Sequence, residues 1–120
     1  MTENGNERDI GFVISKAPLE SGLVSNALTL ALNAQKQGKT IGLFLISDGV
    51  WLGKRNQKNH FIGTFEELLK GGAQVLASEE HLLAAGIATD DVIDGIVVTK
   101  RTYKDLVSNV MENWTKVVSI

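Results

Sequence analysis

The 120-residue chain contains no cysteine. It can therefore form no internal disulfide, thiolate metal site or thiol nucleophile. It also lacks any apolar run close to the ~20 residues that a membrane-spanning helix needs. The polar N-terminus, MTENGNERD, has no apolar segment typical of a signal peptide. We therefore expect a cytoplasmic protein without a membrane partner, in which residues 1–9 form a flexible lead-in.

An excess of charge of either sign is also missing. The formal net charge is −2, which gives no reason to expect a nucleic-acid partner. No GxGxxG or GxxxxGK[ST] pattern occurs, so neither a dinucleotide site nor a P-loop is expected. The two histidines, His60 and His81, are too few for an all-protein zinc site without carboxylate ligands. We expect no metal and no cofactor.

What the sequence does contain is typical of one globular domain. Hydrophobic residues make up 43% and charged residues 22%, and residues 10–120 suffice for one modest core. Short apolar segments alternate with segments of helical spacing, in the pattern βαβαβαβαβ. The predicted strands are 10–15, 40–47, 73–77, 96–99 and 117–120. Because they are apolar throughout rather than alternating, they indicate an α/β fold whose parallel sheet is covered on both faces.

Helices are predicted between these strands. The first begins near Pro18, ends at Gly38 and has an apolar face of Leu23, Ala27, Leu30, Ala31 and Ala34. The second spans 61–71 with Thr64 as its N-cap, after a long surface loop over 50–60. A short helical piece begins at Thr89. The last helix begins at Thr102, with Asp105 in a capping-box-like pair, and its apolar face holds Leu106, Val107, Val110 and Trp114.

The candidate site follows from this topology. The carboxyl ends of parallel strands meet at one edge of the sheet, where α/β proteins bind ligands. The candidate ligand-binding residues follow the first three strands: Ser15, Lys16, Asp48, Gly49, Ser78, Glu79 and His81. Turn chemistry alone also explains Asp48 and Gly49, and the helix dipole alone explains Glu79.

Two roles fit Ser78. It can act as a nucleophile or anion-binding hydroxyl at a helix start, or it can cap the helix by accepting a backbone N–H. A serine hydroxyl needs a base within hydrogen-bond reach, and no acid is placed to orient His81 as that base. We favour the cap, and we leave His81 open between a ligand contact and a surface or interface residue.

The segment 50–60 carries apolar residues in polar surroundings. Trp51 and Leu52 are candidate interface residues, because apolar side chains in a polar loop often bury themselves against a neighbouring subunit. The cations Lys54, Arg55 and Lys58 form either a solvated cluster or a site for an anion or acidic partner.

Several segments occur in an order that resembles a known family. They are a first helix ending in QGK, the strand LFLISDGV, the segment GGAQVLAS, the turn LLAAGI and the segment DDVIDGIVV. Together they span nearly the whole chain and resemble the DsrE/DsrF family, the fold of the sulfur-relay proteins DsrE, DsrF and TusD. The resemblance implies a three-layer α/β/α sandwich with a central five-stranded parallel sheet. It also implies assembly into trimers or hexamers, homomeric or mixed.

This chain differs from many members of that family at the positions of two cysteines. Many cysteine-bearing members have a segment like C-x-x-C-L-x-A-R-G-I after the third strand. Here Ser78 stands at the first cysteine, His81 at the second and Ala85 at the arginine, and the matching residues are Leu82, Ala84, Gly86 and Ile87. In relay members the first cysteine carries a persulfide, which an oxygen cannot form. Sulfurtransferase activity is therefore not expected, and no catalytic residue is assigned.

We accordingly predict a non-catalytic oligomeric subunit or docking partner in sulfur-relay or sulfur-oxidation metabolism. Its expected partners are other DsrE-like subunits and a sulfur-carrier protein. The alternative, from a different class, is a small-molecule or anion-binding protein, or an enzyme, that uses the strand-edge pocket. In that case Ser78 and backbone amides hold the ligand, with Lys16 and His81 helping.

Overall fold

A computed structural model describes residues 5–20 and 22–120 and contains one five-stranded sheet. The strands are β1 (Arg8–Ile14), β2 (Ile41–Leu45), β3 (Gln74–Ser78), β4 (Ile96–Thr99) and β5 (Trp114–Ser119). Their order across the sheet is β4-β3-β2-β1-β5, and every neighbouring pair is parallel. The predicted five-stranded parallel sheet is confirmed.

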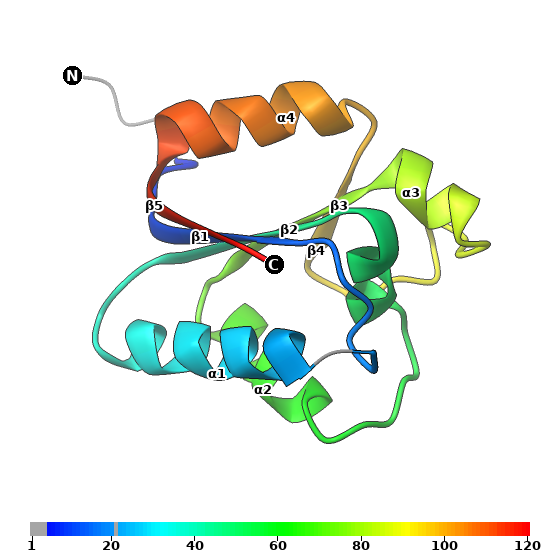
Figure 1. The fold of residues 1–120 in the computed structure, drawn as a ribbon, viewed down its shortest axis with the longest axis horizontal. Coiled ribbons are helices and arrows are strands. Elements are labelled where there is room, and N and C mark those ends of the chain that lie inside the picture. Colours follow the sequence, from blue (N-terminus) through cyan, green and yellow to red (C-terminus); the bar gives the residue numbers. More distant parts are fainter. Residues whose placement is uncertain (1–4, 21) are drawn as a thin grey trace.

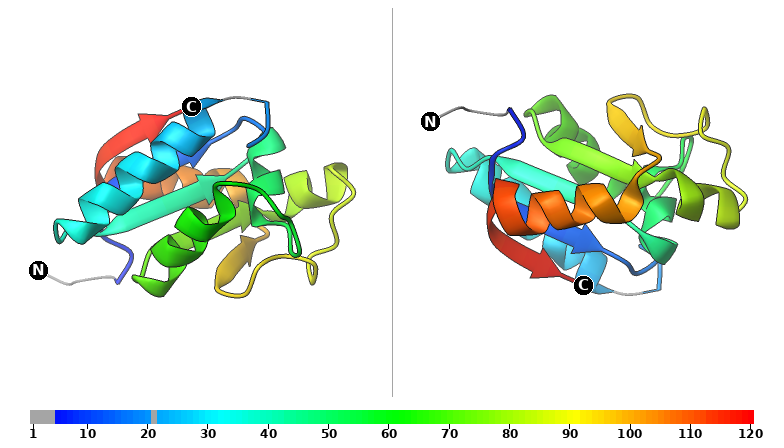
Figure 2. Two further views of the ribbon diagram at one scale, coloured as in Figure 1. Left: turned by 90° about the horizontal axis from the view of Figure 1, so that it is seen from below. Right: turned by 90° about the horizontal axis from the view of Figure 1, so that it is seen from above.

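Helices cover both faces of the sheet, which gives the expected three layers. The helices α1 (Gly22–Lys36) and α2 (Ile62–Lys70) lie on one face, and α4 (Thr102–Ser108) lies on the other (Figure 1). The π-helical turn η2 (Asn109–Asn113) continues α4. Seen from above, α4 crosses the middle of its face and leaves β4 and β5 on either side (Figure 2). Within the described residues, no helix is both long and apolar enough to cross a membrane.

Two further elements lie beyond the carboxyl ends of the strands. They are the 3-10 helix η1 (Ser47–Gly53), which follows β2, and the short helix α3 (Glu79–Ala84), which follows β3. These two elements form the edge of the sheet at which the candidate site is predicted.

The larger core lies between the sheet and α1 and α2. Its fully buried side chains include Phe12, Ile14, Leu43, Leu45, Leu28, Phe65 and Leu68. The inner face of α1 consists of Val24, Ala27, Leu28 and Ala31. The predicted inward residues Leu23 and Leu30 are instead 50% and 55% exposed. Two overlapping apolar stripes share Ala27 and Ala31, so spacing alone did not tell which stripe packs against the sheet.

A smaller core lies under α4 and is built around one indole. Trp114 packs with Val13, Phe44 and Leu76. Its ring lies flat on β1 and β2, where a Cβ on Gly11 would be 1.8 Å from Cδ2 and a Cβ on Gly42 would be 2.7 Å from Nε1. Only glycine fits beneath the ring at these two positions. Trp114 was predicted on the last helix, but it is the first residue of β5, and Val107 is 58% exposed rather than buried.

Three local predictions about the connections were wrong. The segment 50–60 begins inside η1, where Val50 and Leu52 are fully buried and part of the core. Thr89 begins a turn rather than a helix, and the turn leads to a single antiparallel bridge between Lys54 and Val92. Thr64 lies inside α2, which begins at Ile62.

Two further predictions, on the start of the first strand and on the cap of the last helix, were also wrong. β1 begins at Arg8, so residues 8 and 9 belong to the sheet rather than to a lead-in, and residues 1–4 lie outside the described part. Thr102 does not pair with Asp105 in a capping box. Asp105 instead accepts a hydrogen bond from the Thr99 hydroxyl, which in turn accepts from the Arg101 amide.

Candidate functional site

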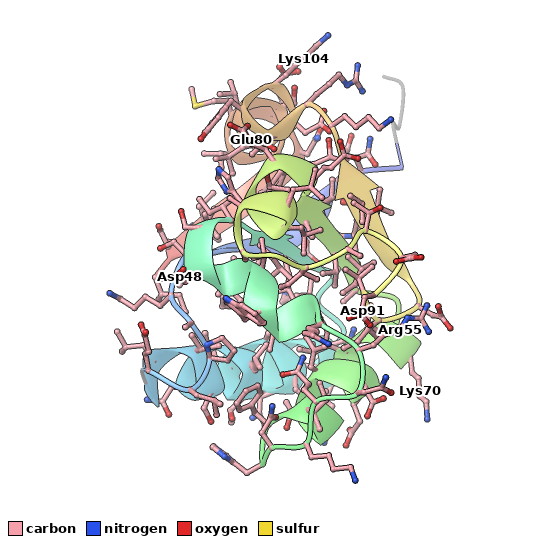
Figure 3. The ribbon with its side chains drawn as sticks, turned by 90° about the vertical axis from the view of Figure 1, so that its right-hand side faces the viewer. Asp48, Arg55, Lys70, Glu80, Asp91 and Lys104 are labelled. Carbon is pink, nitrogen blue, oxygen red and sulfur yellow. The ribbon has the colours of Figure 1, made fainter. Side chains whose placement is uncertain are left out.

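The candidate site lies at the edge where β2, β3 and β4 end, and Figure 3 faces this edge. The figure shows Asp48 on η1 and Glu80 on α3, the two short elements that follow neighbouring strands. Ser78 ends β3 in register with Thr99 of β4. At this edge the structure brings Ser78 and His81 together with residues from η1 and α4.

Ser78 is an N-cap, as favoured from the sequence. Its Oγ accepts the backbone N–H of His81 at 3.1 Å. Its second contact is with the Thr102 hydroxyl, at an oxygen–oxygen distance of 2.6 Å. Ser78 is fully buried and Thr102 is 4% exposed, so this bond joins the end of β3 to the start of α4 inside the protein. Ser78 therefore holds two elements in place.

The His81 side chain links three elements. Its Nδ1 accepts the backbone N–H of Ser47 in η1 at 2.8 Å. Because Nδ1 is the acceptor, the neutral ring carries its proton on Nε2, which lies 3.3 Å from the Tyr103 hydroxyl of α4. The two rings meet edge to face, with centroids 6.1 Å apart. His81 thus ties α3 to both η1 and α4.

The backbone of η1 depends on these contacts. Ser47 has a φ of 49°, in the left-handed region that non-glycine residues rarely adopt. The bond to His81 Nδ1 helps hold it there. Gly49 follows, and a Cβ at Gly49 would lie 2.0 Å from the Ile14 carbonyl oxygen. Gly49 is thus required by packing between η1 and β1, independently of any ligand.

A serine–histidine nucleophile is not assembled by this geometry. Such a pair requires the imidazole to accept the hydroxyl proton. Both ring nitrogens of His81 are instead engaged with Ser47 and Tyr103, and the Ser78 hydroxyl is engaged with Thr102 and the His81 amide. The arrangement is that of a structural polar network at the strand edge.

A small hollow of about 160 Å³ lies beside this network, between η1 and α3. It is lined by Ser47, Asp48, His81, Ala84 and Ala85. Its charged lining residue is a carboxylate, which disfavours an anion as its occupant. Ser78 does not line this hollow and is fully buried.

The remaining predicted ligand residues lie elsewhere or at the margin. The Ser15 hydroxyl donates to the Ile120 carbonyl at 2.6 Å, which joins the ends of β1 and β5. Lys16 is an exposed residue after β1. Glu79 is partly buried in the first turn of α3, where the helix dipole favours an acid.

Thr102 and Tyr103 are the site residues that the sequence did not reveal. Both come from the start of α4, directly after the segment that follows β4. The predicted site residues follow the first three strands only, whereas Thr102 and Tyr103 follow the fourth strand.

The two predicted interface residues are placed differently. Trp51 is 39% exposed, whereas Leu52 is fully buried in the core of its own chain and so has no surface to offer a partner. Trp51 lines a mostly apolar hollow of about 310 Å³ together with Pro18, Leu19 and Lys58. Of the nearby cations, Lys54 pairs with Asp91 at 2.9 Å and Arg55 pairs with Asp94, so both are bound within the chain.

Within residues 5–20 and 22–120, no three side chains of histidine, aspartate or glutamate are grouped so that they could hold a metal ion. The polar network at the strand edge contains one imidazole and several hydroxyls, which is a weak set of metal ligands.

Comparison with known proteins agrees with the fold. The sequence model of the DsrE/DsrF-like family matches residues 8–111. An uncharacterized protein from Methanopyrus kandleri is 35% identical over 111 residues, 89% of this chain and 86% of that protein. An uncharacterized protein from Methanocaldococcus jannaschii is 30% identical over 105 residues, 84% of this chain and 90% of that protein.

Solved structures show the same architecture. The crystal structure of the YchN protein from E. coli has a TM-score of 0.81 and 28% identity, covering 94% of this chain and 99% of that one. A protein of unknown function from Methanobacterium thermoautotrophicum has a TM-score of 0.70 and 21% identity, covering 95% and 99% of the two chains. The second likeness concerns the fold alone.

Proposed function

Because the chain belongs to the DsrE/DsrF-like family, we propose that it is a non-catalytic subunit of a DsrE-like assembly in sulfur-relay or sulfur-oxidation metabolism. The observation that carries this proposal is the state of Ser78. Its hydroxyl is fully buried and bonded to Thr102 and the His81 amide. An oxygen cannot hold a persulfide, and a buried position offers no approach to a partner's thiol.

The surface around Trp51 supports a role as a subunit. Leu19 is 77% exposed and Trp51 is 39% exposed, and both line the apolar hollow beside η1. Exposed apolar groups gathered around a hollow are typical of a protein–protein contact. We assign this surface, defined by Pro18, Leu19, Trp51 and Lys58, to contact with another DsrE-like subunit, and we call it the Trp51 surface.

The strand edge supports a second contact. Leu83 of α3 and Tyr103 of α4 are 58% and 59% exposed, and the Tyr103 hydroxyl reaches His81. These side chains present an apolar rim beside the buried Ser78. We place the docking of a sulfur-carrier protein at this rim, with the sulfur remaining on cysteines of the partner proteins.

Native mass spectrometry at micromolar concentration tests the subunit role. We expect an oligomer, either alone or with a cysteine-bearing DsrE-like protein of the same organism. Trp51→Asp should dissociate it, because a charge in an apolar contact loses its hydration. Leu30→Asp is the matched control, since Leu30 is 55% exposed on α1 outside the Trp51 surface. A monomer under both conditions would contradict the proposal.

A further inference from the structure

The outward face of α4 carries an apolar stripe that no described element of the chain covers. Tyr103, Val107 and Met111 are 59%, 58% and 75% exposed. Because they are spaced four residues apart, they lie one above another along α4 and its continuation η2. In the view from above in Figure 2, α4 is nearest the viewer and no drawn element lies over it. Neighbouring exposed apolar side chains on one helix face indicate a contact with another molecule.

Two opposite charges flank this stripe, one near each end. Lys104 directly follows Tyr103, and Glu112 directly follows Met111. Because their spacing makes about two helical turns, both charges lie on the same side of the stripe. Both residues are exposed, and Lys104 extends outward from α4 in Figure 3. Neither of them takes part in the ion pairs among the described residues, so both are available to charges on another molecule.

We propose that this stripe binds the same stripe of a second copy of the chain, with the two helices antiparallel and Val107 on a two-fold axis. Tyr103 of each copy then packs against Met111 of the other. The same rotation brings Lys104 of each copy beside Glu112 of the other, offset by about 3 Å along the helix axis. The face is therefore complementary to itself in charge and in apolar pattern, as a two-fold contact requires. A parallel pair would instead place like charges together.

The contact is weak by itself and is separate from the Trp51 surface. A standard interface involves about 20–30 residues on each side, whereas the stripe and its two charges are far fewer. We therefore expect dimers near about 0.5 mM protein and monomers at micromolar concentration. The Trp51 surface is formed by η1 and by residues before α1, and α1 lies on the opposite face of the sheet from α4. Tyr103 also belongs to the strand-edge rim, so a second copy and a sulfur carrier compete for it.

Disulfide trapping tests the contact cleanly, because the chain has no cysteine of its own. The background is Trp51→Asp, which removes the other contact, at about 0.5 mM protein. Val107→Cys places one thiol of each copy at the two-fold axis, where the Cα atoms come within the roughly 4.4–6.8 Å that a disulfide spans. In a glutathione redox buffer it should cross-link about tenfold faster than Leu30→Cys. Leu30 is the matched control, since it is 55% exposed on α1.

Two more cysteine positions distinguish an antiparallel from a parallel pair. In the antiparallel pair the two copies of position 111 are about 12 Å apart along the helix axis. Met111→Cys alone should therefore cross-link as slowly as Leu30→Cys. An equimolar mixture of Tyr103→Cys and Met111→Cys should instead form disulfides between the two variants.

Charge exchange tests the flanking pair. Lys104→Glu and Glu112→Lys each place like charges together in the dimer. Each should weaken the dimer about tenfold at low salt, since two pairs change from attraction to repulsion. The double variant restores opposite charges and should restore the dimer, as measured by sedimentation equilibrium.

Three results would overturn the proposal. They are cross-linking of Val107→Cys no faster than that of Leu30→Cys, cross-linking of Met111→Cys alone as fast as that of Val107→Cys, and a double charge exchange that leaves the dimer as weak as either single exchange. None of these results bears on the Trp51 surface, which native mass spectrometry tests at micromolar concentration.

Discussion

The Ser78–Thr102 contact gives the sharpest prediction about the strand edge. If Ser78 caps α3 and joins it to α4 by its hydrogen bond to Thr102, Ser78→Ala must destabilise the protein by an amount that depends on Thr102. The two hydroxyls lie 2.6 Å apart, and both residues are buried. A double-mutant cycle of Ser78→Ala and Thr102→Val isolates their interaction.

The expected magnitudes follow from the contacts. Ser78→Ala removes the cap on the His81 amide, about 1 kcal/mol, and leaves the buried Thr102 hydroxyl unpaired, about 1–2 kcal/mol more. Thr102→Val removes one hydrogen bond but leaves the cap, at about 1 kcal/mol. In the double variant no hydroxyl is left unpaired, so its cost should be about 2 kcal/mol rather than the sum of roughly 3–4 kcal/mol.

Urea unfolding followed by tryptophan fluorescence measures all four proteins. We expect a coupling free energy of about 1–2 kcal/mol. Additive effects, within about 0.5 kcal/mol, would refute the reasoning. A neutral Ser78→Ala would refute it more strongly, because a serine kept for chemistry rather than structure can be removed without loss of stability.

Three further predictions concern other parts of the chain. Gly11→Ala should destabilise the protein by about 3 kcal/mol or more, because its Cβ would lie 1.8 Å from the Trp114 ring; thermal unfolding checks this against Gly22→Ala, whose Cβ meets nothing within 4 Å. Hydrogen bonds from the Thr40 amide and hydroxyl, and then the charge of Lys39, hold the pKa of Asp9 below its ordinary 3.8. The Asp9 carboxylate should therefore stabilise the fold above about pH 4, and this stabilisation should be lost as the pH falls through the lowered pKa. In an acid titration, the free energy of unfolding of Asp9→Asn should therefore fall less steeply with pH than that of the unchanged protein. An equal slope for the two proteins would contradict this. Ser78→Cys introduces the only thiol of the chain, at a position that is fully buried. This thiol should react with a disulfide reagent at least about tenfold more slowly in the folded protein than in the urea-unfolded protein. Equal rates would show that position 78 is open to solvent, as the position of a sulfur-carrying cysteine must be.

The strands were the most predictable part of the fold. β4 spans the predicted residues 96–99, because IVVT is apolar and bounded by Gly95, which has a φ of 100°. The connections were less predictable. Val50 and Leu52 are core residues in η1, but their spacing matches neither a strand face nor an α-helix face over a useful length. Their burial depends on how the chain folds back over the ends of β1 and β2.

The edge of the sheet at which these residues lie was predictable, whereas their contacts were predictable only in part. Parallel strands fix which edge the residues occupy, so Ser78 and His81 were found from the strand ends. The contacts of His81 with Ser47 and Tyr103 depend on the order of the strands in the sheet and on the path of α4. A single sequence specifies neither the strand order nor that path. Leu52 was assigned to an interface from its polar neighbours, although its side chain points into the core.

The measurement that tests the central claim most directly follows sulfur and assembly together. A cysteine-bearing DsrE-like protein of the same organism is loaded as a persulfide, mixed with this chain and examined by native and then denaturing mass spectrometry. The account predicts an oligomer of fixed stoichiometry, of this chain alone or mixed with the partner, that is lost with Trp51→Asp, while all added sulfur remains on the partner. Sulfur bound covalently to this chain, or a chain that stays monomeric with and without the partner, would contradict it.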